Sequence, residues 1–195
     1  MKKIILVSIL AIVIFATSCK KETETDNPNI IHRTTNLEVR VSSYNAYSSM
    51  SIDIDKDSTI DFGLYLQLNK DNNDKYNYLL AIAGEVLHNE MKFISINGDD
   101  YIKTLSKNDS INVGSVLDWS FDCNIFEIEK TIGNTEEKYG FYGKENILVG
   151  IRFLIGTELH YGWIKLDVAS DYKSAIVKEI AYNIRPNIGI KAGEK

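Results

Sequence analysis

The chain has 195 residues and carries 22 Lys and Arg against 27 Asp and Glu, which gives a formal net charge of −5. This acidic balance argues against nucleic-acid binding, which depends on a basic surface. The length is sufficient for one domain with a well-buried core.

The N-terminus has the pattern of an export signal. Lys2 and Lys3 precede an apolar run from Ile4 to Ala16, which is short for a transmembrane helix and typical of a signal-peptide core. The run ends in ATSC, which resembles a bacterial lipobox. That resemblance implies cleavage after residues 1–18 and lipid on Cys19. The alternatives are an ordinary secretory signal with an incidental cysteine, or an apolar anchor that is retained.

Residues 19–35 predict a flexible tether between membrane and domain. The segment opens with polar residues (KKETETDNPN) that bury too little surface to order themselves. Its lysines followed by acidic residues resemble the export signals that carry some lipoproteins to the outer face of the outer membrane. The expected location is therefore the outer membrane, lipid-anchored and surface-exposed. With Cys19 lipidated, Cys123 is the remaining thiol, and we expect it to be a small buried residue rather than a nucleophile.

Residues 36–195 predict a single domain of short β-strands. Apolar and polar residues alternate in LEVRV, SMSIDID, FGLYLQL, MKFISING and NIFEIEK, as in half-buried strands, and YLLAIAG is typical of a buried one. NKDNNDKYN predicts a turn. GNTEEKYGFYGKEN predicts a loop that is rich in glycine and aromatic residues.

The C-terminal third has the clearest pattern. ILVGIRFLIG and HYGWIKLDV flank Gly156-Thr157-Glu158, which predicts an antiparallel hairpin. AIVKEIAYNI predicts a strand or a short helix. No window has an apolar stripe of helical length, so the expected fold is all-β, an antiparallel β-sandwich that follows a cleaved lipoprotein signal peptide.

Four aspartates in DIDKDSTIDF form a candidate calcium loop. Calcium takes six to eight oxygen ligands, and the loop offers the carboxylates of Asp53, Asp55, Asp57 and Asp61 with the backbone carbonyl of Thr59. The pattern resembles the D-x-D-x-D-x-x-x-D loops of integrin-like propeller repeats and dockerin-type modules.

That aspartate pattern departs from the family loops in two ways. A glycine is common in the tight middle of such loops, where Lys56, Ser58 and Thr59 stand here, and Leu64 replaces the glutamate that would close an EF-hand. The alternative is that the first two aspartates continue the solvent face of a strand into a turn. Mutual repulsion of four carboxylates without a cation favours the calcium interpretation.

Aromatic residues suggest a possible ligand surface. KYGFYGKEN places Tyr139, Phe141 and Tyr142 among glycines, and aromatic faces beside polar groups suit sugar rings. The alternative is that tryptophans 119 and 163 are core residues and that the tyrosines pack at sheet edges.

The sequence gives little support for a catalytic site. His32, His88 and His160 show no metal or triad spacing. Carboxylate pairs such as Asp118/Asp122 or Glu127/Glu129 would serve a glycan hydrolase only at a defined separation.

The block VGIRFLIGTELHYGWIKLDV, followed by AYN and IKAGEK, is similar to the C-terminal part of a β-rich domain of exported bacterial proteins with no assigned activity. That resemblance implies the fold and the compartment and adds no catalytic residue. Alternation in this block places Tyr161 and Trp163 on one strand face and Ile164 and Leu166 on the other. The expected function is a membrane-anchored lipoprotein with a non-catalytic binding or structural domain that calcium stabilises. Its expected partners are the membrane, through the lipid on Cys19, and glycans or envelope proteins. The alternatives are a cell-surface glycan-binding module and, less favoured, a glycan-degrading hydrolase.

Overall fold

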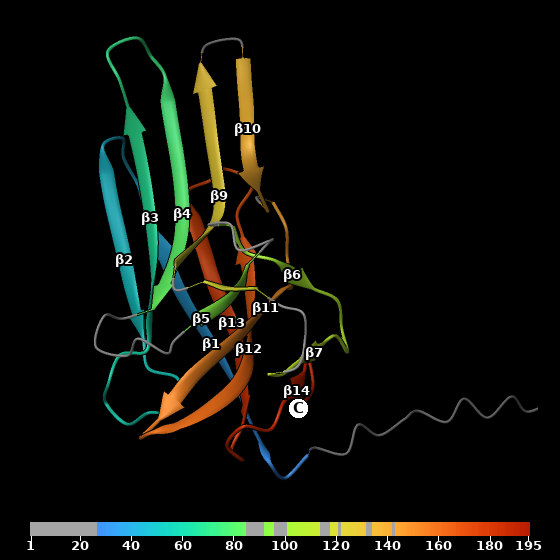
Figure 1. Cartoon of the computed structure of the whole chain (residues 1–195). Coiled ribbons are helices and arrows are strands. Elements are labelled where there is room, and N and C mark those ends of the chain that lie inside the picture. Colours follow the sequence, from blue (N-terminus) through green and yellow to red (C-terminus); the bar gives the residue numbers. More distant parts are fainter. Residues whose placement is uncertain are drawn as a thin grey trace, which may run out of the picture.

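The computed structural model describes residues 27–84, 92–95, 101–113, 118–120, 122–131, 134–141 and 143–195. Every regular element in these ranges is a β-strand, and all strand pairs are antiparallel (Figure 1). Within the same ranges no helix has the length and apolarity needed to cross a membrane. The predicted all-β antiparallel sandwich is confirmed.

Two sheets form the sandwich. The first has five strands in the order β10, β9, β4, β3, β2. Their bounds are Asn134–Gly140, Asp122–Thr131, Tyr76–Gly84, Phe62–Lys70 and Ala46–Ile52. The second has seven strands in the order β1, β13, β12, β11, β5, β8, with β6 also paired to β11. Their bounds are Ile30–Arg40, Ser174–Asn183, Glu158–Val168, Ile147–Ile155, Lys92–Ser95, Asp118–Ser120 and, for β6, Thr104–Leu105.

The main core lies between the two sheets. Alternation directs Leu64, Leu66 and Leu68 of β3 inward, and all three are fully buried. Phe62 of β3 meets Phe93 of β5 edge to face, with ring centroids 5.8 Å apart. This contact joins the sheets close to the point where the β2–β3 connection enters β3.

A second core covers the outer face of the seven-stranded sheet. Tyr161 and Trp163 of β12 are fully buried there, while Ile164 and Leu166 point into the main core, so the predicted division of this strand is confirmed. The cover consists of the segments around the two-stranded sheet of β7 (Ser110–Ile111) and β14 (Ile190–Lys191). Trp163 Nε1 donates a hydrogen bond to the Glu194 carbonyl at 3.1 Å.

Several elements agree with their sequence patterns and three do not. The β11–β12 hairpin turns at Gly156, whose φ of 63° suits glycine, and AIVKEIAYNI belongs to strand β13. The predicted loop at GNTEEKYG is wrong, because Asn134–Gly140 pairs with β9 as strand β10. The predicted tether extends too far, because residues 30–35 open strand β1 and residues 30–34 pair with β13. Residues 101–121 show no sustained period of apolar residues in the sequence, and the described part of this segment contributes the short strands β6, β7 and β8.

Candidate metal centre

The aspartate loop, residues 53–61, connects β2 to β3. Asp53 shapes its first turn, because its carboxylate accepts hydrogen bonds from the backbone N–H of Lys56 at 2.6 Å and of Ser58 at 2.9 Å. Lys56 and Ser58 have φ values of 66° and 76°, the left-handed region that favours glycine. The two residues therefore adopt the conformation for which related loops use glycine, and the carboxylate of Asp53 stabilises it.

Three carboxylates converge in this loop. Asp53, Asp55 and Asp61 each present an oxygen, and the three oxygens lie within 4.8 Å of one another. Asp61 is only 4% exposed, and its Oδ2 accepts the backbone N–H of Ile54 at 2.6 Å. Two oxygens that bind one calcium ion at 2.3–2.6 Å are at most about 5 Å apart. The spacing therefore fits a single ion shared by all three residues.

Two of the three converging carboxylates, Asp61 and Asp55, have raised pKa values. The pKa of Asp61 is raised to about 6, mainly by burial and also by the charges of the neighbouring aspartates. The hydrogen bond from the backbone N–H of Ile54 lowers it and offsets part of this rise. Burial also raises the pKa of Asp55, and the charges of Asp57 and Asp53 raise it as well. The hydrogen bond from the backbone N–H of Asp57 lowers it. Charge repulsion of this kind is what a bound cation relieves.

Arg33 contacts the loop without pairing with its carboxylates. Arg33 Nη2 donates to the backbone carbonyl of Asp53 and not to its carboxylate. Among the residues that the structure describes, no lysine or arginine forms an ion pair with Asp53, Asp55 or Asp61. The cluster has no histidine or cysteine, so its donor set is that of a hard cation.

Two of the predicted ligands lie outside this triad. Asp57 is exposed, and its Oδ1 accepts the backbone N–H of Thr59 at 2.7 Å. Asp57 therefore shapes the turn, and its carboxylate is not one of the three that converge. The half-buried Thr59 is in the same turn, one residue after Ser58.

The other predicted site residues are spread over the chain. Cys19 and Tyr142 lie outside the described residues. Tyr139 belongs to strand β10, and Phe141 is half-buried and packs against the main core. Cys123 is buried, in agreement with its expected role as a small core residue.

His32 and His160, the two histidines that the structure describes, lie in separate contacts. His88 lies outside the described residues, and His160 is buried with Nδ1 2.8 Å from the Asn183 carbonyl. His32, which was assigned to the tether, is on β1 with Nε2 2.7 Å from Glu179 Oε2. The side chains of the carboxylate pairs considered for glycan hydrolysis are not among those described.

Sequence reasoning missed a charged cluster on the outer face of the seven-stranded sheet. The Glu179 cluster comprises His32, Lys165, Glu179 and Lys195, with the carboxylate at its centre. Lys165 Nζ lies 2.6 Å from Glu179 Oε1, and Lys195 Nζ lies 2.9 Å from Oε2. Burial would raise the pKa of Glu179, but hydrogen bonds from the two lysines and His32 outweigh it and hold the pKa at about 2. The signal available in sequence was a pair of adjacent charged residues, Lys178 and Glu179, in the largely apolar strand β13.

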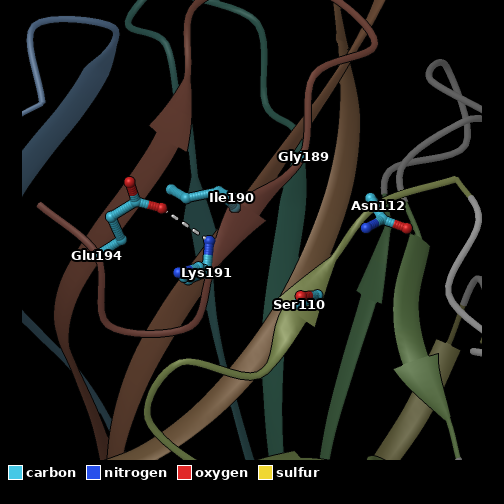
Figure 2. A pocket seen from close by; sticks show the side chains of 6 residues that line it. All are labelled: Ser110, Asn112, Gly189, Ile190, Lys191 and Glu194. Carbon is cyan, nitrogen blue, oxygen red and sulfur yellow. Dashed lines mark hydrogen bonds between the residues drawn. The ribbon is translucent and has the colours of Figure 1, made fainter.

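A shallow pocket lies where β7 meets β14. Figure 2 shows its lining residues, Ser110, Asn112, Gly189, Ile190, Lys191 and Glu194. The Glu194 carboxylate accepts the backbone N–H of Lys191 at 2.9 Å and the side-chain amide of Asn27 at 3.1 Å. These bonds tie the C-terminal residues to Asn27, so the Glu194 carboxylate has a structural use.

Comparison with known protein families, with characterised proteins and with solved structures found no match to this chain.

Proposed function

We propose that this chain is an exported lipoprotein, anchored through Cys19, whose β-sandwich holds a structural calcium ion at Asp53, Asp55 and Asp61 and serves a non-catalytic binding or architectural role in the cell envelope. The observation that carries the calcium proposal is the convergence of three carboxylates that have no cationic partner among the described side chains. The N-terminal export pattern carries the anchor.

Calcium fits the donor set better than other common cations. Zinc and copper favour nitrogen or sulfur ligands, which the triad lacks. Magnesium demands octahedral geometry and is seldom bound by an all-protein carboxylate cage. Calcium accepts six to eight oxygens in flexible geometry, so three carboxylates can be completed by backbone carbonyls and water.

The position of the loop indicates a structural role for the ion. Ile52 ends β2, Phe62 begins β3, and these two residues face each other in the pairing of the strands. An ion held by Asp53 on one side and Asp61 on the other would link the two strand ends directly. It would therefore fix the β2–β3 register where the loop enters the main core.

Calorimetric titration of the full chain with calcium chloride tests the ion. We expect one site per chain, and we expect Asp61→Asn to abolish the binding heat. Asp71→Asn is the matched control, because Asp71 likewise accepts backbone N–H groups, from Asn73 and Lys75, in the β3–β4 turn but lies outside the triad. Absence of heat and of any rise in melting temperature with calcium would refute the site.

Metabolic labelling with a radioactive fatty acid in a bacterial host tests the anchor separately. We expect label on the wild-type chain and none on Cys19→Ala, with Cys123→Ala as the control that stays labelled. An unlabelled wild-type chain would refute lipidation without bearing on calcium.

A further inference from the structure

In the part of the chain that the structure describes, four strands end the strand orders of the two large sheets, and the two-residue β6, which pairs with β11 alone, is too short to offer an edge. The four are β1 and β8 in the seven-stranded sheet and β10 and β2 in the five-stranded sheet. An edge strand presents unpaired backbone N–H and C=O groups to any extended chain, and proteins block such pairing with charge, bulges or very short strands.

Three of the four edges carry these protections. β1 has charged residues and a register shift between Thr34 and Leu37. β10 contains Glu136, Glu137 and Lys138 and has a register shift before Tyr139. β8 has only three residues.

Strand β2 carries none of them. Its sequence AYSSMSI has no charged residue and no proline, and all seven residues pair with β3 in one continuous register. Figure 1 shows β2 as the outermost strand of its sheet. Tyr47 on this strand is 60% exposed, one of the most exposed large side chains in the described residues.

We propose that β2 is a dimerisation edge, at which two copies of this chain pair antiparallel and join their five-stranded sheets into one. With the two-fold axis at Ser49, the centre of the strand, each Tyr47 faces Ser51 of the partner. The small serine leaves space for the ring of the tyrosine, and Ser49 meets its own copy.

The charge of the strand favours a second copy over a foreign peptide. The chain carries a net charge of −5, so two copies repel each other at long range, and a contact between acidic surfaces would add to this repulsion. An uncharged strand avoids this repulsion when it faces itself, and it has no charge with which to select a charged partner. Tyr47 supplies the exposed aromatic anchor that interfaces commonly use.

Sedimentation of the full chain in detergent over a range of concentrations tests the proposal. We expect a monomer–dimer equilibrium for the wild type and at least a tenfold higher dissociation constant for Ser49→Lys, because two lysines would meet at the axis. Gln67→Lys is the matched control, since it adds the same charge one strand inward, on β3, opposite Tyr47. We expect it to dimerise like the wild type.

A charge-complementation experiment guards against a folding defect. Ser49→Lys and Ser49→Glu should each be monomeric alone and should form a heterodimer when mixed. A wild type that stays monomeric at every concentration would overturn the proposal and leave the edge to another protein. Loss of dimer in Gln67→Lys, or retention of dimer in Ser49→Lys, would overturn it as well.

Discussion

Glu179 and Asp61 are both largely shielded from water, but the charges around them are opposite. Two lysines and His32 surround Glu179, whereas two further aspartates surround Asp61. The pKa of Glu179 is accordingly held at about 2 and that of Asp61 is raised to about 6. The Glu179 cluster is neutralised by the chain itself. The aspartate loop has no such compensation among the described side chains, which is why it is the better candidate for an external ion.

The largest expected effect comes from removing the charge at the centre of the Glu179 cluster. Glu179→Gln should lower the free energy of unfolding by about 2 to 3 kcal/mol, because Lys165 loses a charged hydrogen-bond partner in a site where the Glu179 side chain is 16% exposed. Urea unfolding followed by tryptophan fluorescence measures this change. The loss should be the same with calcium or with a chelator.

The matched control for that experiment is Glu38→Gln. Glu38 pairs with Arg40 at 2.6 Å, but these side chains are 36% and 58% exposed. Surface pairs of this kind contribute about 0 to 1 kcal/mol. An equal loss of unfolding free energy in both variants would show that the Glu179 cluster stabilises the fold no more than an exposed ion pair does.

Removing a charge from the aspartate loop should act in the opposite direction when no metal is present. Asp55→Asn relieves repulsion with Asp53 and Asp61 and retains an acceptor for the N–H of Asp57. We expect the free energy of unfolding in chelator to rise by about 1 kcal/mol. We also expect calcium to stop stabilising the variant, whereas it should stabilise the wild type by about 2.7 kcal/mol at a calcium concentration 100 times the dissociation constant. Thermal melts in calcium and in chelator measure both. A variant that is destabilised in chelator would contradict the repulsion argument.

Acid should remove the contribution of Glu179 without affecting the Gln variant. The pKa of this group is lowered in the folded state from its ordinary 4.5 to about 2, so its stabilisation is complete above pH 4.5 and declines as the pH falls toward 2. The difference in unfolding free energy between wild type and Glu179→Gln should therefore narrow over this interval. A difference that stays constant from pH 5 to pH 2.5 would contradict this pKa assignment.

The two sites also differ in how far sequence could predict them. The aspartate loop is local, and its spacing predicted three carboxylates that do converge, although it could not show that the carboxylate of Asp57 accepts the backbone N–H of Thr59 instead. The Glu179 cluster joins residues 147 positions apart, His32 and Glu179, through the pairing of β1 with β13. The spacing of residues along the sequence does not show how two distant strands such as β1 and β13 pair.

The same distinction explains the fold predictions. The β11–β12 hairpin was predictable because both strands alternate and a glycine turn separates them. Strand β10 was not, because NTEEKYG has no apolar alternation and its strand character comes from pairing with β9. Strand β1 starts within a polar segment, and its partner β13 is distant in the sequence. Pairing with another strand, adjacent in sequence for β10 and distant for β1, therefore decided the elements that composition misassigned.

The smallest expected effect distinguishes a three-carboxylate site from a four-carboxylate one. Asp57 is exposed, and its carboxylate accepts the N–H of Thr59 outside the converging group. Asp57→Asn keeps an oxygen acceptor for that bond, so we expect a change within about 0.5 kcal/mol in chelator. Calcium affinity should fall less than tenfold, because only the long-range attraction of one exposed charge is lost. Calorimetry beside Asp55→Asn measures the difference, and abolition of binding in Asp57→Asn would show that the loop closes around the ion with all four carboxylates.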